Sequence, residues 1–199
     1  CQDYEHIDPH YTVIVKDGDY ETRTADPENL AASDRFFADF VDKCHKEGIR
    51  VIMDGVFNHC GSFHRMMDRA GIYHRAGGYE PGAYESAASP YREFFRFEDE
   101  RPEAWPGNDS YEKWWGNDTL PKLNYEGSEA LKEYILSIGK KWVSAPYKAD
   151  GWRLDVAADL GHSEEYNHSF WRTYRKAVKE ANPEAVVFAE HYGDAYAWL

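Results

Sequence analysis

Apolar side chains recur along this chain at two spacings, which predict an alternation of helices and strands. Helical spacing begins after Ser33, a suitable N-cap, and ends at Gly48. Its apolar positions are Phe36, Phe37, Phe40, Val41 and Cys44. The next segment, 50–56, is β-branched and apolar and predicts a strand that carries Asp54 near its end. A helix followed at once by a strand is typical of α/β architecture.

The same alternation returns in the last third of the chain. We predict a helix capped by Ser128, a strand around Arg153, and a helix that ends at Asn182, before a proline. A final strand is predicted over 185–190. Parallel strands joined by helices present functional groups at the carboxyl ends of the strands.

Three acidic residues stand at the predicted carboxyl ends of three strands: Asp54, Asp155 and Glu190. Each by itself has a plain explanation as a structural acid, and Arg153 with Asp155 alone fits a structural ion pair equally well. Three acids at consecutive strand ends are harder to explain in that way. They indicate a shared site.

Residues 57–126 interrupt the alternation. The run has no sustained period, is rich in Gly, Pro, Tyr, Trp, Asn and Arg, and is too long for a simple connection. It predicts an inserted domain that overhangs the site. Its adjacent Trp114 and Trp115 fit either a sugar-stacking surface or a core, and the need of a small insert for a core favours the second.

Composition narrows the range of partners. The 199 residues carry a formal net charge of -13, which argues against nucleic acid and against an anionic membrane surface. No apolar stretch is long enough to span a membrane. The three cysteines are an odd number at irregular spacing, so they indicate neither a disulfide framework nor a zinc site. A neutral ligand is compatible with this charge.

Two carboxylates that face each other across a pocket are the apparatus of glycoside hydrolysis, in which one is ionised and the other protonated. Arg153 is expected to favour the ionised form of Asp155, which suits a nucleophile. Apolar neighbours at Val186 and Phe188 are expected to favour the protonated form of Glu190, which suits a general acid.

Four segments, in order and at suitable spacing, resemble signature regions of the α-amylase family, glycoside hydrolase family 13. They are Asp54–His59, Leu120–Asn124, Gly151–Asp155 and Phe188–Glu190. The form of the second segment resembles neopullulanases and cyclomaltodextrinases. One such motif is a weak signal, whereas four in sequence make a chance resemblance improbable.

The resemblance implies an α/β fold: part of a (β/α)8 TIM barrel, about strands three to five, with a B domain inserted after strand three. The implied domains are a barrel segment over 1–57, the B domain over 58–126, and a second barrel segment over 127–199. The first strand, most of the second, and a third catalytic aspartate are expected to lie outside this chain. The isolated chain is therefore expected to be inactive and to self-associate through open sheet edges.

The resemblance also implies a retaining hydrolase of α-glucosidic bonds in starch, pullulan or maltodextrins. Asp155 would be the nucleophile and Glu190 the general acid/base. Arg153 would hold Asp155, and His59 would bind the sugar beside the scissile bond. Outside the motif, His59 would be read as an ordinary loop histidine.

The remaining implied site residues surround that pair. Asp54 and Asn58 would organise the site, and His191 and Tyr192 would line the acceptor side, although Tyr192 fits plain packing equally well. Asn58 corresponds to a calcium ligand in many relatives, so a structural calcium is an expectation, while no cofactor is expected to be required.

The alternative is an amylase-like carbohydrate-binding or ancillary protein without catalysis. Such proteins typically lose the nucleophile or the acid, and both stand here in intact motifs, at Asp155 and Glu190. The sequence does not determine the compartment, and a cytoplasmic location is favoured only because the proteins that it resembles are often cytoplasmic.

Overall fold

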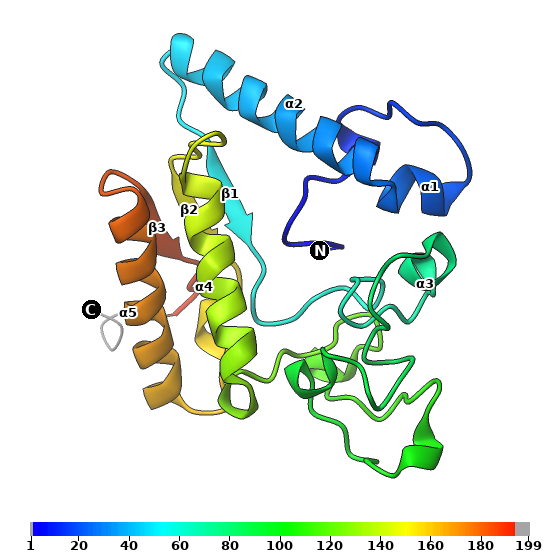
Figure 1. The fold of residues 1–199 in the computed structure, drawn as a ribbon. Coiled ribbons are helices and arrows are strands. Elements are labelled where there is room, and N and C mark those ends of the chain that lie inside the picture. Colours follow the sequence, from blue (N-terminus) through cyan, green and yellow to red (C-terminus); the bar gives the residue numbers. More distant parts are fainter. Residues whose placement is uncertain (1, 194–199) are drawn as a thin grey trace. The chain divides into compact units, whose positions relative to one another are not determined.

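The computed structural model describes residues 2–193 and divides them into two compact units (Figure 1). The loop unit comprises the residues up to Phe37 together with His59–Gly127, and the sheet unit comprises Ala38–Asn58 together with the residues from Ser128 onward. The three acids predicted to form a site all belong to the sheet unit. The proposed domain boundaries at 58 and 126 stay a prediction.

The sheet unit is built on three parallel strands in the order β1, β2, β3 (Figure 1). They are β1 (Ile52–Gly55), β2 (Gly151–Leu154) and β3 (Val186–Ala189). Asp54 is paired with Arg153, which is paired with Phe188, so these positions lie in one row across the sheet. The three strands predicted from the sequence are confirmed.

Two helices pack on the sheet face that carries Trp152, α4 (Glu129–Val143) and α5 (Glu164–Ala181) (Figure 1). The Trp152 indole N–H donates to the Gly139 carbonyl of α4 at 3.0 Å, and its ring meets Tyr174 of α5 with centroids 6.4 Å apart. A Cβ atom at Gly139 would lie 2.7 Å from the Tyr174 ring, so the absence of a side chain there permits the close approach of the helices. A short 3-10 segment, Ala157–Asp159, follows β2.

The predicted start of the first long helix was wrong. The helix α2 (Pro27–Lys46) begins well before Ser33, which is buried inside it and donates its hydroxyl to the Asn29 carbonyl at 2.9 Å. Pro27 has the fixed φ angle that suits the first turn, and the preceding Asp26 accepts from the Glu28 amide at 2.9 Å. The apolar pattern missed this start because the first turn carries few apolar residues.

The loop unit contains little regular structure besides α1 (Tyr20–Ala25), the part of α2 up to Phe37, and α3 (Ile72–Ala76). Its 3-10 segments are Pro9–Tyr11, Arg92–Phe94, Pro102–Ala104, Trp114–Gly116 and Tyr125–Gly127. Its largest fully buried side chains are Tyr73, Phe95, Met66, Met67 and Leu123. This part of the chain therefore has its own apolar core. None of the helices in residues 2–193 is long and apolar enough to cross a membrane.

Candidate active site

Arg153 joins three carboxylates at the carboxyl end of the sheet. Its Nη1 lies 2.7 Å from Asp54 Oδ1 and 2.6 Å from Asp155 Oδ1, and its Nη2 lies 2.7 Å from Glu190 Oε1. Hydrogen bonds to Asp54 and then to Asp155 raise the pKa of Arg153, so the guanidinium stays charged. The structure brings the three acids together on one guanidinium, while their assignment as a functional site and their chemical roles stay predictions.

The backbone of the sheet sets this geometry. Side chains alternate along β2, so Trp152 and Leu154 enter the core while Arg153 and Asp155 share the opposite side. Hydrogen bonds continue past the strand ends: the Asp155 amide donates to the Gly55 carbonyl at 3.0 Å, and the Glu190 amide donates to the Leu154 carbonyl at 2.8 Å. Both carboxylates are thus positioned on rigid backbone.

Val156, directly after Asp155, has a strained backbone conformation in which its amide binds Glu190. Its φ of 46° and ψ of 41° are left-handed, a conformation that a β-branched residue rarely adopts. In this conformation its amide donates to Glu190 Oε2 at 3.0 Å. Sequence reasoning missed this contact, because valine carries no signal for a left-handed position.

The two carboxyl groups interact, and the directions of their pKa shifts differ from those that the sequence predicts. Burial raises the pKa of Asp155 above its ordinary value, against the opposing effect of Arg153. Hydrogen bonds from the Tyr192 hydroxyl and from the Val156 amide lower the pKa of Glu190. The predicted apolar surroundings of Glu190 were wrong: the side chains that precede it, Val186 and Phe188, are about half exposed.

The other sheet-unit residues of the predicted site differ in their exposure. Tyr192 is 93% exposed and donates its hydroxyl to Glu190 Oε1, which favours its prediction as a site residue over plain packing. His191 is exposed, and the Asp54 side chain is 58% exposed. Asn58 is buried at 1% exposure, in keeping with a structural role.

A structural calcium ion at Asn58 stays a prediction. Within residues 2–193, no group of three or more His, Cys, Asp and Glu side chains is arranged to hold a metal ion. Calcium in proteins is held by carboxylates as well as by neutral oxygens such as the amide oxygen of asparagine.

His59 belongs to the loop unit. Its ring stacks on Trp114 with centroids 4.7 Å apart and planes inclined by 8°. Burial, with a further contribution from the charge of Lys122, lowers the pKa of His59 to about 4. A neutral imidazole near pH 7 suits hydrogen bonding to a sugar hydroxyl, so the predicted role is chemically reasonable.

The tryptophan pair of the predicted insert is not core. Trp115 is 85% exposed and Trp114 is half-buried, and their rings stack with centroids 4.9 Å apart. The expectation that both rings fill the core was wrong. The core of the loop unit is supplied by other aromatic and apolar side chains, so it does not require this pair.

Comparisons with known proteins identify the family. The family model for the α-amylase catalytic domain matches residues 29–198. The chain is 33% identical over 197 residues to a cyclomaltodextrinase of Geobacillus thermopakistaniensis strain MAS1, covering 99% of this chain and 26% of that protein. It is 33% identical over 164 residues to neopullulanase 2 of Thermoactinomyces vulgaris, covering 82% of this chain and 24% of that protein.

The structure is similar to that of a solved cyclomaltodextrinase, with a TM-score of 0.66 and 28% sequence identity, over 99% of this chain and 27% of the other. The chain thus spans about a quarter of the length of these relatives. Together with the family match, this likeness indicates a TIM-barrel type of fold, of which the three-stranded parallel sheet is a part.

Proposed function

The chain belongs to the α-amylase family of glycoside hydrolases, and from that premise we propose that the intact protein hydrolyses α-glucosidic bonds by a retaining mechanism. The observation that carries the proposal is the arrangement of Asp155 and Glu190 on one guanidinium, at the carboxyl ends of neighbouring parallel strands. The motifs of this chain contain both the proposed nucleophile, Asp155, and the proposed acid, Glu190, which favours catalysis over an ancillary role.

In this mechanism the Asp155 carboxylate attacks the anomeric carbon, and the glycosidic bond breaks as Glu190 gives its proton to the leaving oxygen. Glu190 then takes a proton from water, which attacks the glycosyl-enzyme ester and releases Asp155. Arg153 holds Asp155 in place and stabilises its ionised form.

The first step requires a proton on Glu190, whereas in the free site the pKa of Glu190 is lowered and that of Asp155 is raised. The largest influence that lowers the pKa of Glu190 is the hydrogen bond from exposed Tyr192. A sugar that displaces this hydroxyl and excludes water would raise the pKa of Glu190. Substrate binding is thus the step that would prepare the acid.

The finer architecture is part of the same proposal. Residues 1–57 would supply the end of barrel strand two and strand three, 58–126 the B domain, and 127–199 strands four and five. A third catalytic aspartate would lie outside this chain, so the isolated chain would be inactive. His59 would bind the sugar beside the scissile bond, and His191 and Tyr192 would line the acceptor side.

The substrate class proposed is α-glucan: starch, pullulan or maltodextrins. Relatives named cyclomaltodextrinase and neopullulanase support it. The net charge of -13 is compatible with this neutral ligand.

The test is hydrolysis of pullulan, starch and β-cyclodextrin by the intact protein. Asp155→Asn and Glu190→Gln are each expected to lower kcat/KM by about a thousandfold or more, because each removes a group that acts in the transition state. The matched controls are Asp159→Asn and Glu184→Gln, which alter exposed acids close by in the chain and are expected to leave activity unchanged.

Full activity of Asp155→Asn would show that the nucleophile is a different group. A wild-type protein that binds these glucans without cleaving any of them would support the ancillary reading instead.

A further inference from the structure

Trp115 lies at the tip of a short turn in the loop unit and is mostly open to solvent. The turn is closed by a bridge between Lys113 and Pro121, and the Trp114 amide donates to the Leu120 carbonyl at 2.9 Å. The Asn117 amide donates to the Trp114 carbonyl at 3.1 Å, which fixes the backbone on both sides of Trp115. The indole is therefore presented from an ordered backbone, yet it is 85% exposed.

The backbone at Trp115 is also in an unfavourable conformation. Its φ of 54° and ψ of 29° are left-handed, which is unfavourable for a residue other than glycine. Glycine would fit this position without strain, as Gly116 does next to it at a φ of 71°. Because the exposed side chain adds little to the core, stability alone does not account for tryptophan here.

The rings around Trp115 form a continuous aromatic stack. Trp115 lies on Trp114 with planes inclined by 22°, and Trp114 lies on His59 with planes inclined by 8°. One face of the Trp115 indole is thus covered by Trp114. Its high exposure means that the other face is open to a ligand.

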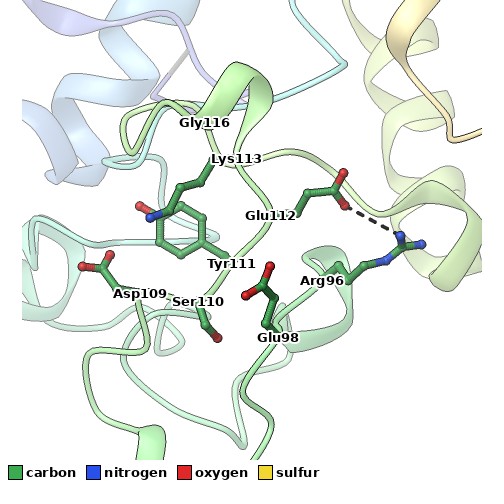
Figure 2. Close-up of a pocket in the computed structure, with 8 residues that line it drawn as sticks. All are labelled: Arg96, Glu98, Asp109, Ser110, Tyr111, Glu112, Lys113 and Gly116. Carbon is green, nitrogen blue, oxygen red and sulfur yellow. Dashed lines mark ion pairs between the residues drawn. The ribbon is translucent and has the colours of Figure 1, made fainter.

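A polar pocket adjoins this turn (Figure 2). It has a volume of about 510 Å³, and Lys113 and Gly116, which flank the Trp114–Trp115 pair in the chain, line it. Such a volume is in the range of small-molecule sites. Its other lining residues are Arg96, Glu98, Asp109, Ser110, Tyr111 and Glu112.

The pocket contains hydrogen-bonding groups of both charges. Arg96 Nη1 and Glu112 Oε2 are 3.9 Å apart, a distance that leaves room for a hydroxyl to bind both (Figure 2). The Glu98 carboxylate also lies at this pocket (Figure 2). Three carboxylates against two cations would repel an anionic ligand, while a neutral ligand with many hydroxyl groups could use donors and acceptors alike.

We propose that Trp115 and the adjoining pocket form a glucan-binding subsite, in which the open indole face stacks on a glucosyl ring and the pocket binds its hydroxyl groups. A glucosyl ring has an apolar C–H face and a polar rim, which match an exposed aromatic face beside a polar pocket. The choice of glucan as the ligand rests on the proposed function. The unfavourable backbone conformation at Trp115 would then direct the indole toward the ligand.

The test measures the binding of maltoheptaose by calorimetry to the intact protein carrying Asp155→Asn, which is expected to leave the ligand uncleaved. Adding Trp115→Ala is expected to weaken binding by about tenfold, the change that corresponds to about 1.4 kcal/mol. Trp115→Phe is expected to retain most of the affinity because it keeps an aromatic face. Glu98→Ala is expected to weaken binding by a few-fold.

The matched control is Tyr11→Ala, which removes another aromatic side chain of the loop unit with 86% exposure and is expected to leave binding unchanged. Trp115→Gly separates folding from binding: it is expected to melt at or above the temperature of the parent, since the strain is relieved, and still to bind weakly.

Equal binding with and without Trp115 would overturn the subsite, and so would a complete absence of maltoheptaose binding. Hydrolysis that depends on Asp155 combined with binding that is independent of Trp115 rejects the subsite alone. Binding that depends on Trp115 in a wild-type protein without hydrolysis supports the subsite and rejects the proposed catalysis.

Discussion

At the scale of the residue, the site depends on the geometry of one guanidinium. Arg153 presents several N–H donors in a planar group, so two of its nitrogens satisfy carboxylates from three strand ends. Its side chain is 29% exposed, and water therefore only partly screens these contacts. Without the guanidinium, the carboxylates would repel each other in a partly buried site.

We therefore expect Arg153→Ala to lower the free energy of unfolding at pH 7 by about 1–3 kcal/mol, less than for a fully buried pair because of solvent screening. Glu190 has a lowered pKa in the folded state, so its stabilising contribution is present above about pH 4.5 and is lost as the pH falls through its folded pKa. The effect of Arg153→Ala should shrink accordingly in urea unfolding at acidic pH.

The contribution of Asp155 to stability depends on pH in the opposite direction. Its pKa is raised, so its ionisation costs stability as the pH rises above the ordinary value of 3.8. Lys46→Ala is the control, since it removes an exposed ion pair with Asp42 and is expected to change stability by less than about 0.5 kcal/mol. A loss from Arg153→Ala that is equal at neutral and acidic pH would contradict the electrostatic explanation.

At the scale of the element, helix caps and strand alternation place the acids. Ser128 begins α4 by accepting from the Leu131 amide at 3.2 Å, and Ser163 begins α5 by accepting from the Tyr166 amide at 3.2 Å. The two helices then pack on the core face of β2, which turns Arg153 and Asp155 to the other side.

Ser128→Ala is expected to cost about 1 kcal/mol of stability, because an amide of the first turn loses its acceptor. Ser128→Asp, which keeps an acceptor, should lose much less. The control is Ser137→Ala on the exposed side of the same helix, where the hydroxyl only donates back to the Tyr134 carbonyl, and the expected change is within about 0.5 kcal/mol. Equal losses in thermal unfolding at Ser128 and Ser137 would argue against the cap.

At the scale of the whole molecule, the sheet leaves apolar surface at its edges. Within the described strands, β3 pairs only with β2, and its Val186 and Phe188 are 46% and 50% exposed. At the opposite edge, Ile52 of β1 is 37% exposed. Edge strands of this kind pair readily with other chains. In the full barrel proposed above, further strands would cover both edges.

The isolated 199-residue chain is accordingly expected to self-associate in a concentration-dependent manner, measured by light scattering. Phe188→Lys should shift it toward the monomer, since a charge on an edge strand opposes pairing. Val15→Lys, at an apolar position of the loop unit with 58% exposure, should have no such effect. A wild-type chain that stays monomeric at high concentration would show that the edges do not associate.

The sequence by itself determined the alternating elements, the acids at the strand ends and the family, because capping, periodicity and motif spacing are local along the chain. It placed Asp54, Arg153, Asp155 and Glu190 in one region correctly. The early start of α2 was missed because the first turn of this helix has almost no apolar pattern.

Only the tertiary structure decided the properties that depend on neighbours in space. Glu190 has a lowered pKa because Tyr192 and Val156 donate to it, whereas the sequence suggested apolar surroundings. Trp115 is 85% exposed on a left-handed backbone, and other side chains fill the core of the loop unit. Burial, strain and shared hydrogen bonds arise from contacts between distant segments, and no local pattern records them.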